Sequence, residues 1–70
     1  MGGITMNFML EALVKKLEGE IAIAKANILV YTRNSTGIGE HPEVVEAIET
    51  QVAKIAEAQD KINTIKNLEL

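Results

Sequence analysis

Residues 34–42 read NSTGIGEHP, and this short stretch decides the fold because it separates two helical segments. Gly, Asn, Ser and Pro are the residues that most often mark turns. A continuous helix through this stretch would lose about 1 kcal/mol at each of the two glycines and about 3 kcal/mol at the proline. The sequence therefore predicts a turn over residues 34–41 rather than one long helix.

The segment before the turn repeats apolar residues in alternating steps of four and three, the heptad period of a helix with one buried face. We predict a helix over about residues 6–33, capped at its start by Thr5 or Asn7. Its seam is the stripe that faces the partner helix, and it is predicted to contain Leu10, Val14, Leu17, Ile21, Ala24, Ile28 and Tyr31.

The segment after the turn shows the same period. Pro42 suits the first helical turn, where its missing N–H would have no partner in any case, so we predict a helix over about residues 42–67. Gln59 is a polar residue in the predicted stripe, and it either fixes the register of the two helices or lies at the stripe's edge in water. The seam is predicted to contain Val45, Ile48, Val52, Ile55, Gln59 and Ile62, with Val44, Ala58 and Ile65 widening the stripe.

Two helices of similar length predict an all-α fold, an antiparallel two-helix hairpin forming a single domain over residues 1–70. Between Ile21 and Tyr31 the first helix is apolar around most of its circumference, which is more than one partner helix can cover. A core from a chain this short supplies only about 3 to 5 kcal/mol. We therefore expect coiled-coil-like assembly into a homodimeric four-helix bundle. The predicted oligomer interface contains Ile21, Ala22, Ile23, Ala26, Val30 and Tyr31.

The charge balance narrows the classes of partner. Seven Lys and Arg stand against ten Asp and Glu, a formal net charge of -3, which argues against nucleic acid and anionic membranes. No stretch approaches the roughly 18 to 20 apolar residues that a membrane span needs, and the first residues do not match a secretory signal. We expect a cytoplasmic protein.

The inventory of reactive residues is small. The Gly37-Ile38-Gly39 stretch lacks the third glycine and the preceding strand of a dinucleotide-binding fingerprint. His41, with Glu40 and Glu43, forms the only cluster that resembles metal ligands, and one imidazole with two flexible acids falls short of a zinc site unless symmetry joins two copies. With no Cys and a single His, no nucleophile and base can be assembled. We expect no catalytic residue, no cofactor and no metal, and hence no enzyme.

Two functions follow. The first is a non-catalytic structural or protein-interaction module that acts as a homo-oligomeric bundle, with itself and an unidentified protein as partners. The alternative is a small hairpin dimer that regulates nucleic acid, with Lys15, Lys16 and Lys25 as a basic strip for phosphates. This alternative rests on the analogy of the scaffold alone, and acidic residues interrupt the strip at Glu11, Glu18 and Glu20.

The stretch from Leu17 to Ile65, and especially GIGEHPEVVEAIETQVAKIAEAQDKI at residues 37–62, resembles short uncharacterised helical-hairpin proteins of marine tailed phages that infect cyanobacteria. The resemblance covers roughly two thirds of the chain and excludes the residues before Leu10. It implies a phage-encoded accessory protein, in the host cytoplasm or associated with the virion. It implies no catalytic or binding residue.

Overall fold

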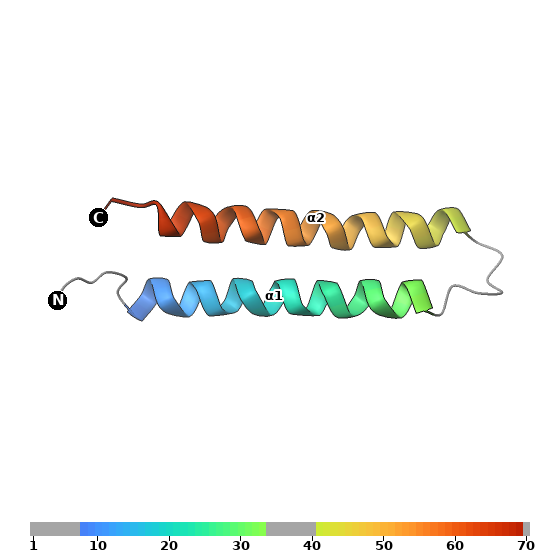
Figure 1. Ribbon diagram of the computed structural model, residues 1–70, viewed down its shortest axis with the longest axis horizontal. Coiled ribbons are helices and arrows are strands. Elements are labelled where there is room, and N and C mark those ends of the chain that lie inside the picture. The colour runs from blue at the N-terminus through green and yellow to red at the C-terminus, as the bar shows by residue number, and fades with distance from the viewer. Residues whose placement is uncertain (1–7, 34–40, 70) are drawn as a thin grey trace.

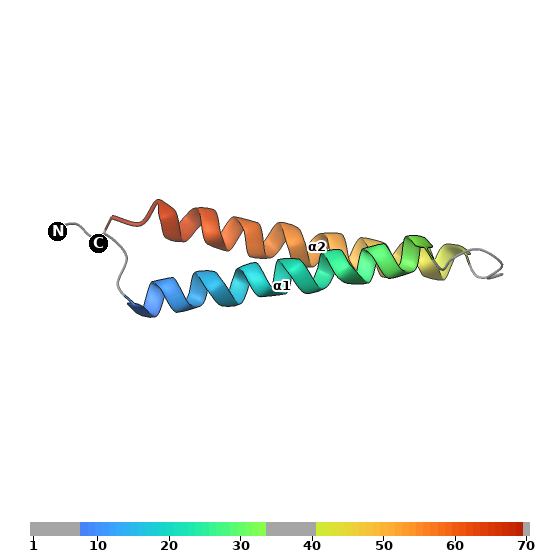
Figure 2. The same ribbon diagram turned by 60° about the horizontal axis from the view of Figure 1, so that its bottom comes forward.

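The computed structural model describes residues 8–33 and 41–69, and these form two α-helices. Helix α1 runs from Phe8 to Arg33 and helix α2 from His41 to Lys66, each 26 residues long. They lie side by side and antiparallel, each about 39 Å long at 1.5 Å per residue, so that the start of α1 and the end of α2 share one end (Figure 1). The turned view of Figure 2 shows the two helices crossing at a shallow angle. The predicted all-α hairpin is confirmed, and the described residues contain no strand.

The observed helix ends differ slightly from the predicted ones. Helix α1 ends at Arg33 as predicted, and its predicted start at residues 6–7, with the predicted caps, lies outside the described residues. Helix α2 begins at His41, so this residue belongs to the helix and not to the turn. The rest of the predicted turn, residues 34–40, also lies outside the described part of the chain.

Helix α2 ends one residue before the predicted boundary. The backbone N–H of Asn67 donates to the Thr64 carbonyl at 3.1 Å, and that of Leu68 donates to the Ile65 carbonyl at 3.2 Å. Bonds that span three residues instead of four tighten the last turn and satisfy carbonyls that no helical N–H can reach. The α-helix therefore stops at Lys66 in a tighter turn.

The seam of α1 is the predicted one. Val14, Leu17 and Ala24 are buried, and Leu10, Ile21, Ile28 and Tyr31 are half-buried. The seven positions keep the alternating steps of four and three along the whole helix, so one narrow stripe of α1 faces α2 throughout.

In the seam of α2, every second predicted residue was wrong by one position. Val45 and Val52 are 62% and 50% exposed, and Gln59 is exposed as well. The residue immediately before each of them faces α1 instead, so that the residues noted as widening the stripe belong to the seam itself. The observed seam, again in steps of four and three, is Val44, Ile48, Gln51, Ile55, Ala58, Ile62 and Ile65.

The core lies at one end of the rod. The start of α1 and the end of α2 lie together in what we call the open half, residues 8–21 and 55–69, and residues 22–33 and 41–54 form the turn half. The buried cluster is confined to the open half and consists of Val14, Leu17, Ala58, Ile62 and Ile65, with Leu10 and Ile21 packed against it. Ala24 and Gln51 are the buried residues nearest the turn, and beyond them, at 25–33 and 43–50, no described side chain is buried. The hairpin therefore leaves the packing of its turn half incomplete.

Gly19 lies in the middle of α1 on its exposed side, and a Cβ added there would meet nothing within 4 Å. Because Gly in a helix interior costs about 0.5 to 1 kcal/mol relative to Ala, Gly19→Ala should stabilise the fold by that amount. Thermal unfolding should then occur at least about 2 °C higher. The matched control is Ala12→Gly, at an equally exposed site two turns earlier, which should lower the midpoint by a similar margin. An unchanged midpoint for both variants would contradict a continuous α1.

Candidate interaction surface

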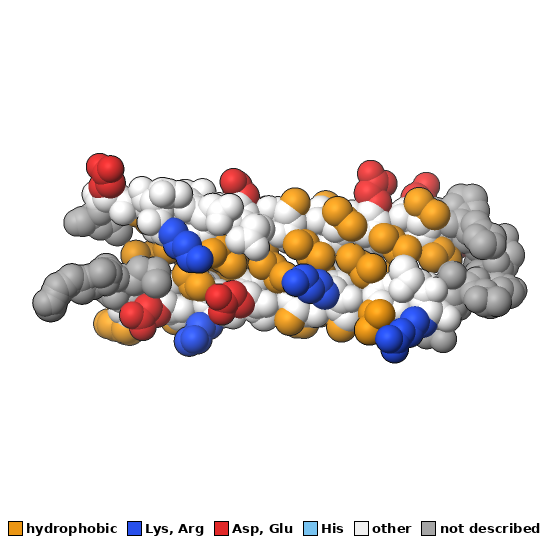
Figure 3. Space-filling model, in the orientation of Figure 1, with side chains coloured by type: hydrophobic (Ala, Val, Ile, Leu, Met, Phe, Trp, Pro, Cys, Tyr) orange, Lys and Arg blue, Asp and Glu red, His pale blue; other side chains and the backbone are white. Residues whose placement is uncertain are grey.

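The turn half exposes large apolar side chains from both helices. On α1, Ile23, Leu29 and Val30 are 63%, 48% and 54% exposed, and on α2 Val45 and Val52 are at least half exposed. Figure 3 shows hydrophobic side chains along the groove between the helices and over the turn half of this face, with charged side chains around them in both halves. A hydrophobic surface of this extent on a small protein is typical of an interaction site.

The seam divides this surface into two flanks. In an antiparallel pair, the residues one position after the seam residues lie on the same side of both helices, and those one position before lie on the opposite side. We call the first side the valine flank, because Val45 and Val52 follow the seam residues Val44 and Gln51. Leu29, which follows Ile28, lies on the same flank. Ile23 and Val30 precede seam residues and lie on the other side.

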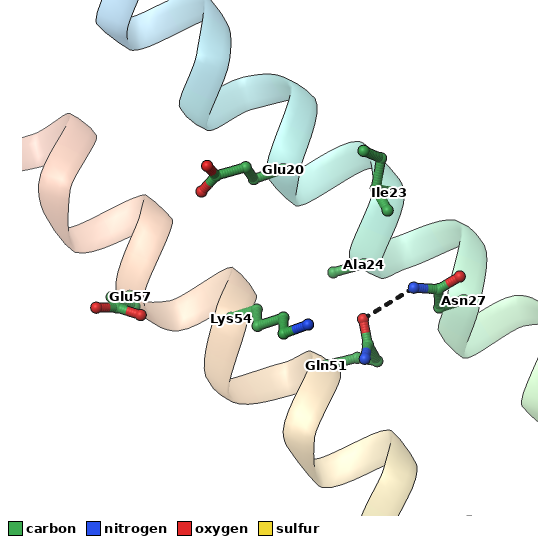
Figure 4. A pocket seen from close by; sticks show the side chains of 7 residues that line it. All are labelled: Glu20, Ile23, Ala24, Asn27, Gln51, Lys54 and Glu57. Atoms are coloured by element: carbon green, nitrogen blue, oxygen red, sulfur yellow. Dashed lines mark hydrogen bonds between the residues drawn. The ribbon is translucent and has the colours of Figure 1, made fainter.

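The second side, the amide flank, has a polar centre. Asn27 Nδ2 donates a hydrogen bond to Gln51 Oε1 at 3.1 Å (Figure 4). Gln51 is 7% exposed and is the one buried polar residue among those described. Beside this bond lies an open hollow of about 350 Å³, lined by Glu20, Ile23, Ala24, Asn27, Gln51, Lys54 and Glu57. The small Ala24 side chain leaves this space between the helices.

Charges on the helix surfaces form short-range pairs. On α2, Lys61 Nζ lies 3.6 Å from Glu57 Oε2. On α1, Lys16 is paired with Glu20. The hydrogen bond that Lys16 donates lowers the pKa of the Glu20 carboxyl below its ordinary value. Both pairs are exposed, so each contributes only a few tenths of a kcal/mol and neither defines a site.

The structure separates the six residues of the predicted oligomer interface into two groups, half-buried and exposed. Ile21 and Tyr31 are half-buried in the seam of α1, so their apolar surface is largely used within the hairpin. Ala22, Ile23, Ala26 and Val30 are exposed and remain free to meet another molecule. The contributions of Val45 and Val52 were missed because the prediction assigned both to the internal seam. Their seven-residue spacing, which places them on one face of α2, was the available signal.

Most residues of the predicted metal-like cluster and of the glycine stretch lie outside the described part of the chain. Glu40 and the His41 side chain lie outside what the structure describes, as do Gly37 and Gly39, and Glu43 is exposed. Within residues 8–33 and 41–69, no three His, Asp or Glu side chains come close enough to share a metal ion. Neither described helix is long and apolar enough to cross a membrane.

The predicted basic strip is crossed by acids. Lys16 is paired with Glu20, and Lys15 lines a shallow depression together with Glu11 and Glu18. A phosphate backbone approaching this face would meet carboxylates beside each of these two lysines.

The chain matches no known protein family, curated protein or solved structure. The resemblance carried by residues 37–62 therefore stays a prediction from the sequence.

Proposed function

We propose that this protein is a non-catalytic interaction module whose hairpins associate with one another, most simply as a homodimeric four-helix bundle. One observation carries the proposal: the turn half contains no buried described side chain beyond Ala24 and Gln51, yet it exposes large apolar residues from both helices. A second hairpin laid on that half would complete the missing core. Each helix would then bury two apolar sides, its seam against the other helix of the hairpin and one flank against the second hairpin, as a helix of a four-helix bundle does.

The exposed area of the chain supports the same proposal. The whole 70-residue chain, with the residues outside the two helices included, exposes 5285 Å², whereas a compact monomer of its 7.6 kDa mass exposes about 4,300 Å². A standard protein interface removes about 800 Å² from each partner. Association through one interface of ordinary size would therefore bring the exposed area close to that of compact proteins.

The role of the bundle is to present its outer surface to a further protein. If the chain is phage-encoded, as the resemblance of residues 37–62 implies, that protein belongs to the host or to the virion. No observation on the described residues favours the nucleic-acid alternative, because acids accompany Lys15 and Lys16.

Light scattering after size-exclusion chromatography tests the proposal. At micromolar concentration the expected mass is about 15 kDa, twice the 7.6 kDa of the chain. Thermal unfolding should also move to higher temperature as the protein concentration rises, because association stabilises only the folded chain. A fully helical protein of 7.6 kDa, with an unfolding midpoint independent of concentration, would refute self-association.

A further inference from the structure

The structure assigns the dimer contact to the valine flank, with the turn halves of both copies at the same end of the bundle. This inference rests on the self-association proposed above, and the occupant of the flank is a second copy of the chain. It names a surface that includes α2, whereas the interface predicted from the sequence lay on α1 alone.

The two sides of the hairpin differ in what each helix contributes. The core of a four-helix bundle takes apolar side chains from both helices of each hairpin. On the valine flank of the turn half, α1 supplies Leu29 and α2 supplies Val45 and Val52. On the amide flank, Ile23 and Val30 have no apolar counterpart of that size on α2, which there presents Lys54 and Glu57 around the hollow. Only the valine flank thus offers an apolar face from both helices.

The valine flank also carries charges that fit a second copy in one orientation. The Asn27–Gln51 hydrogen bond shows which residues of the two helices are level with one another: residue 25 with about residue 53, and residue 11 with about residue 67. With the turn halves together, α1 of one copy lies on α2 of the other. Lys25 then lies within one helical turn of the partner's Glu49, and Glu11 faces the partner's Lys66. Opposite charges meet at both ends of the contact.

The reversed orientation juxtaposes unlike surfaces. With the turn halves at opposite ends, α1 lies on α1 of the partner, and residue 25 is level with about residue 16. Lys25 would then lie between the partner's Lys15 and Glu18, so that repulsion from one offsets attraction to the other. Glu11 and Glu18 would lie on the apolar turn half of the other copy. Both the charges and the apolar residues therefore favour the orientation with the turn halves together.

Two glutamate substitutions at similarly exposed valine and isoleucine sites test the choice of flank. Val52→Glu places a charge in the proposed contact, and Ile23→Glu places one on the amide flank. By light scattering at one concentration, Val52→Glu should shift the mass from about 15 kDa to about 7.6 kDa while Ile23→Glu stays dimeric. Circular dichroism accompanies both measurements. Loss of helix in Val52→Glu alone would also support the contact, because Val52 is exposed in the single hairpin.

The opposite result separates the two proposals. A monomeric Ile23→Glu beside a dimeric Val52→Glu would overturn the valine-flank contact and leave self-association standing. A helical wild-type monomer would overturn self-association itself.

A spin-label distance tests the orientation. The chain has no cysteine, so Arg33→Cys, at the exposed end of α1, gives one labelling site per copy. With the turn halves together, the two labels should be about 15 to 25 Å apart, across the diagonal of the bundle. With the turn halves at opposite ends, the separation along the rod alone is about 40 Å, because residue 33 lies about 19 Å from the middle of α1. A distance near 40 Å would overturn the proposed orientation.

Discussion

Ala58→Asp is expected to unfold the hairpin. Ala58 is 2% exposed and belongs to the same buried cluster as Val14, Leu17 and Ile62. An aspartate there would place a charge among the buried apolar side chains of that cluster. The effective cost of burying an unpaired ion is several kcal/mol, which equals or exceeds the roughly 3 to 5 kcal/mol that a core of this size supplies. Circular dichroism at 25 °C should therefore show loss of most of the helix.

The matched control is Ala53→Asp, on the exposed side of the same helix. Aspartate is a poorer helix former than alanine, and Glu49 and Glu57 one turn away repel it, so the cost is about 1 kcal/mol. This variant should remain folded with a lowered unfolding temperature. Equal effects of the two substitutions would mean that Ala58 does not face α1.

The seam of α1 could be predicted from the sequence because its alternatives are clearly polar. One position after Leu10, Val14, Leu17 and Ala24 come Glu11, Lys15, Glu18 and Lys25. Moving the stripe by one residue would therefore bury charges, which costs far more than any gain in packing. The buried face of α1 was therefore predicted as much from the position of its charged residues, which must stay exposed, as from the heptad period of its apolar residues.

On α2, no charged residue separates the correct stripe from its alternative. Two stripes share Ile48, Ile55 and Ile62 and differ only in the residues between them. One contains Val45, Val52 and Gln59, and the other contains Val44, Gln51, Ala58 and Ile65. Apolarity favours Val52 over Gln51, yet α2 buries Gln51 because Ala58 and Ile65 hold the open half in register. A straight seam then carries Gln51 inward one heptad before Ala58.

Burial of Gln51 depends on a hydrogen bond from Asn27, which the heptad period of the sequence does not predict. Asn27 lies beside the seam of α1, not in it, and its amide donates to Gln51 across the helix pair. A buried polar atom with a hydrogen bond costs little compared with one that has none. The pairing of residues 24 positions apart follows from the register of the two helices and not from the local sequence. Of the two alternatives for Gln59, the position at the edge of the stripe in water is confirmed, and the polar residue of the seam is Gln51.

The part of the candidate interaction surface on α1 could be predicted from the sequence, and the part on α2 could not. The excess of apolar residues on α1 between Ile21 and Tyr31 is a property of the sequence alone, and four of the six predicted interface residues are exposed. The share of α2 in the apolar surface appears only once the seam is placed correctly, because Val45 and Val52 become free when Val44 and Gln51 turn inward.

Leu17→Ala is expected to destabilise the fold by about 3 to 5 kcal/mol. Leu17 is 2% exposed and is the largest fully buried side chain in the described structure. Truncating a buried leucine loses the transfer free energy of its methyl groups and leaves a cavity, and a two-helix layer can collapse only partly around it. Ile55, a predicted seam residue of α2, is half-buried, so a smaller loss is expected for Ile55→Ala. Because this loss is as large as the roughly 3 to 5 kcal/mol that the core supplies, a urea titration followed by circular dichroism should find the variant largely unfolded already without urea.

The same substitution one turn earlier provides the control. Leu13 is 40% exposed and precedes the seam residue Val14, so Leu13→Ala removes the same atoms from a site that water already reaches. Since alanine is also the best helix former, the expected cost is below about 1 kcal/mol. The ratio of the two losses measures how far the open half alone stabilises the hairpin. A loss below about 1 kcal/mol for Leu17→Ala would mean that the cluster around Leu17 is not the core, and that the stability of the chain comes from association of its turn half.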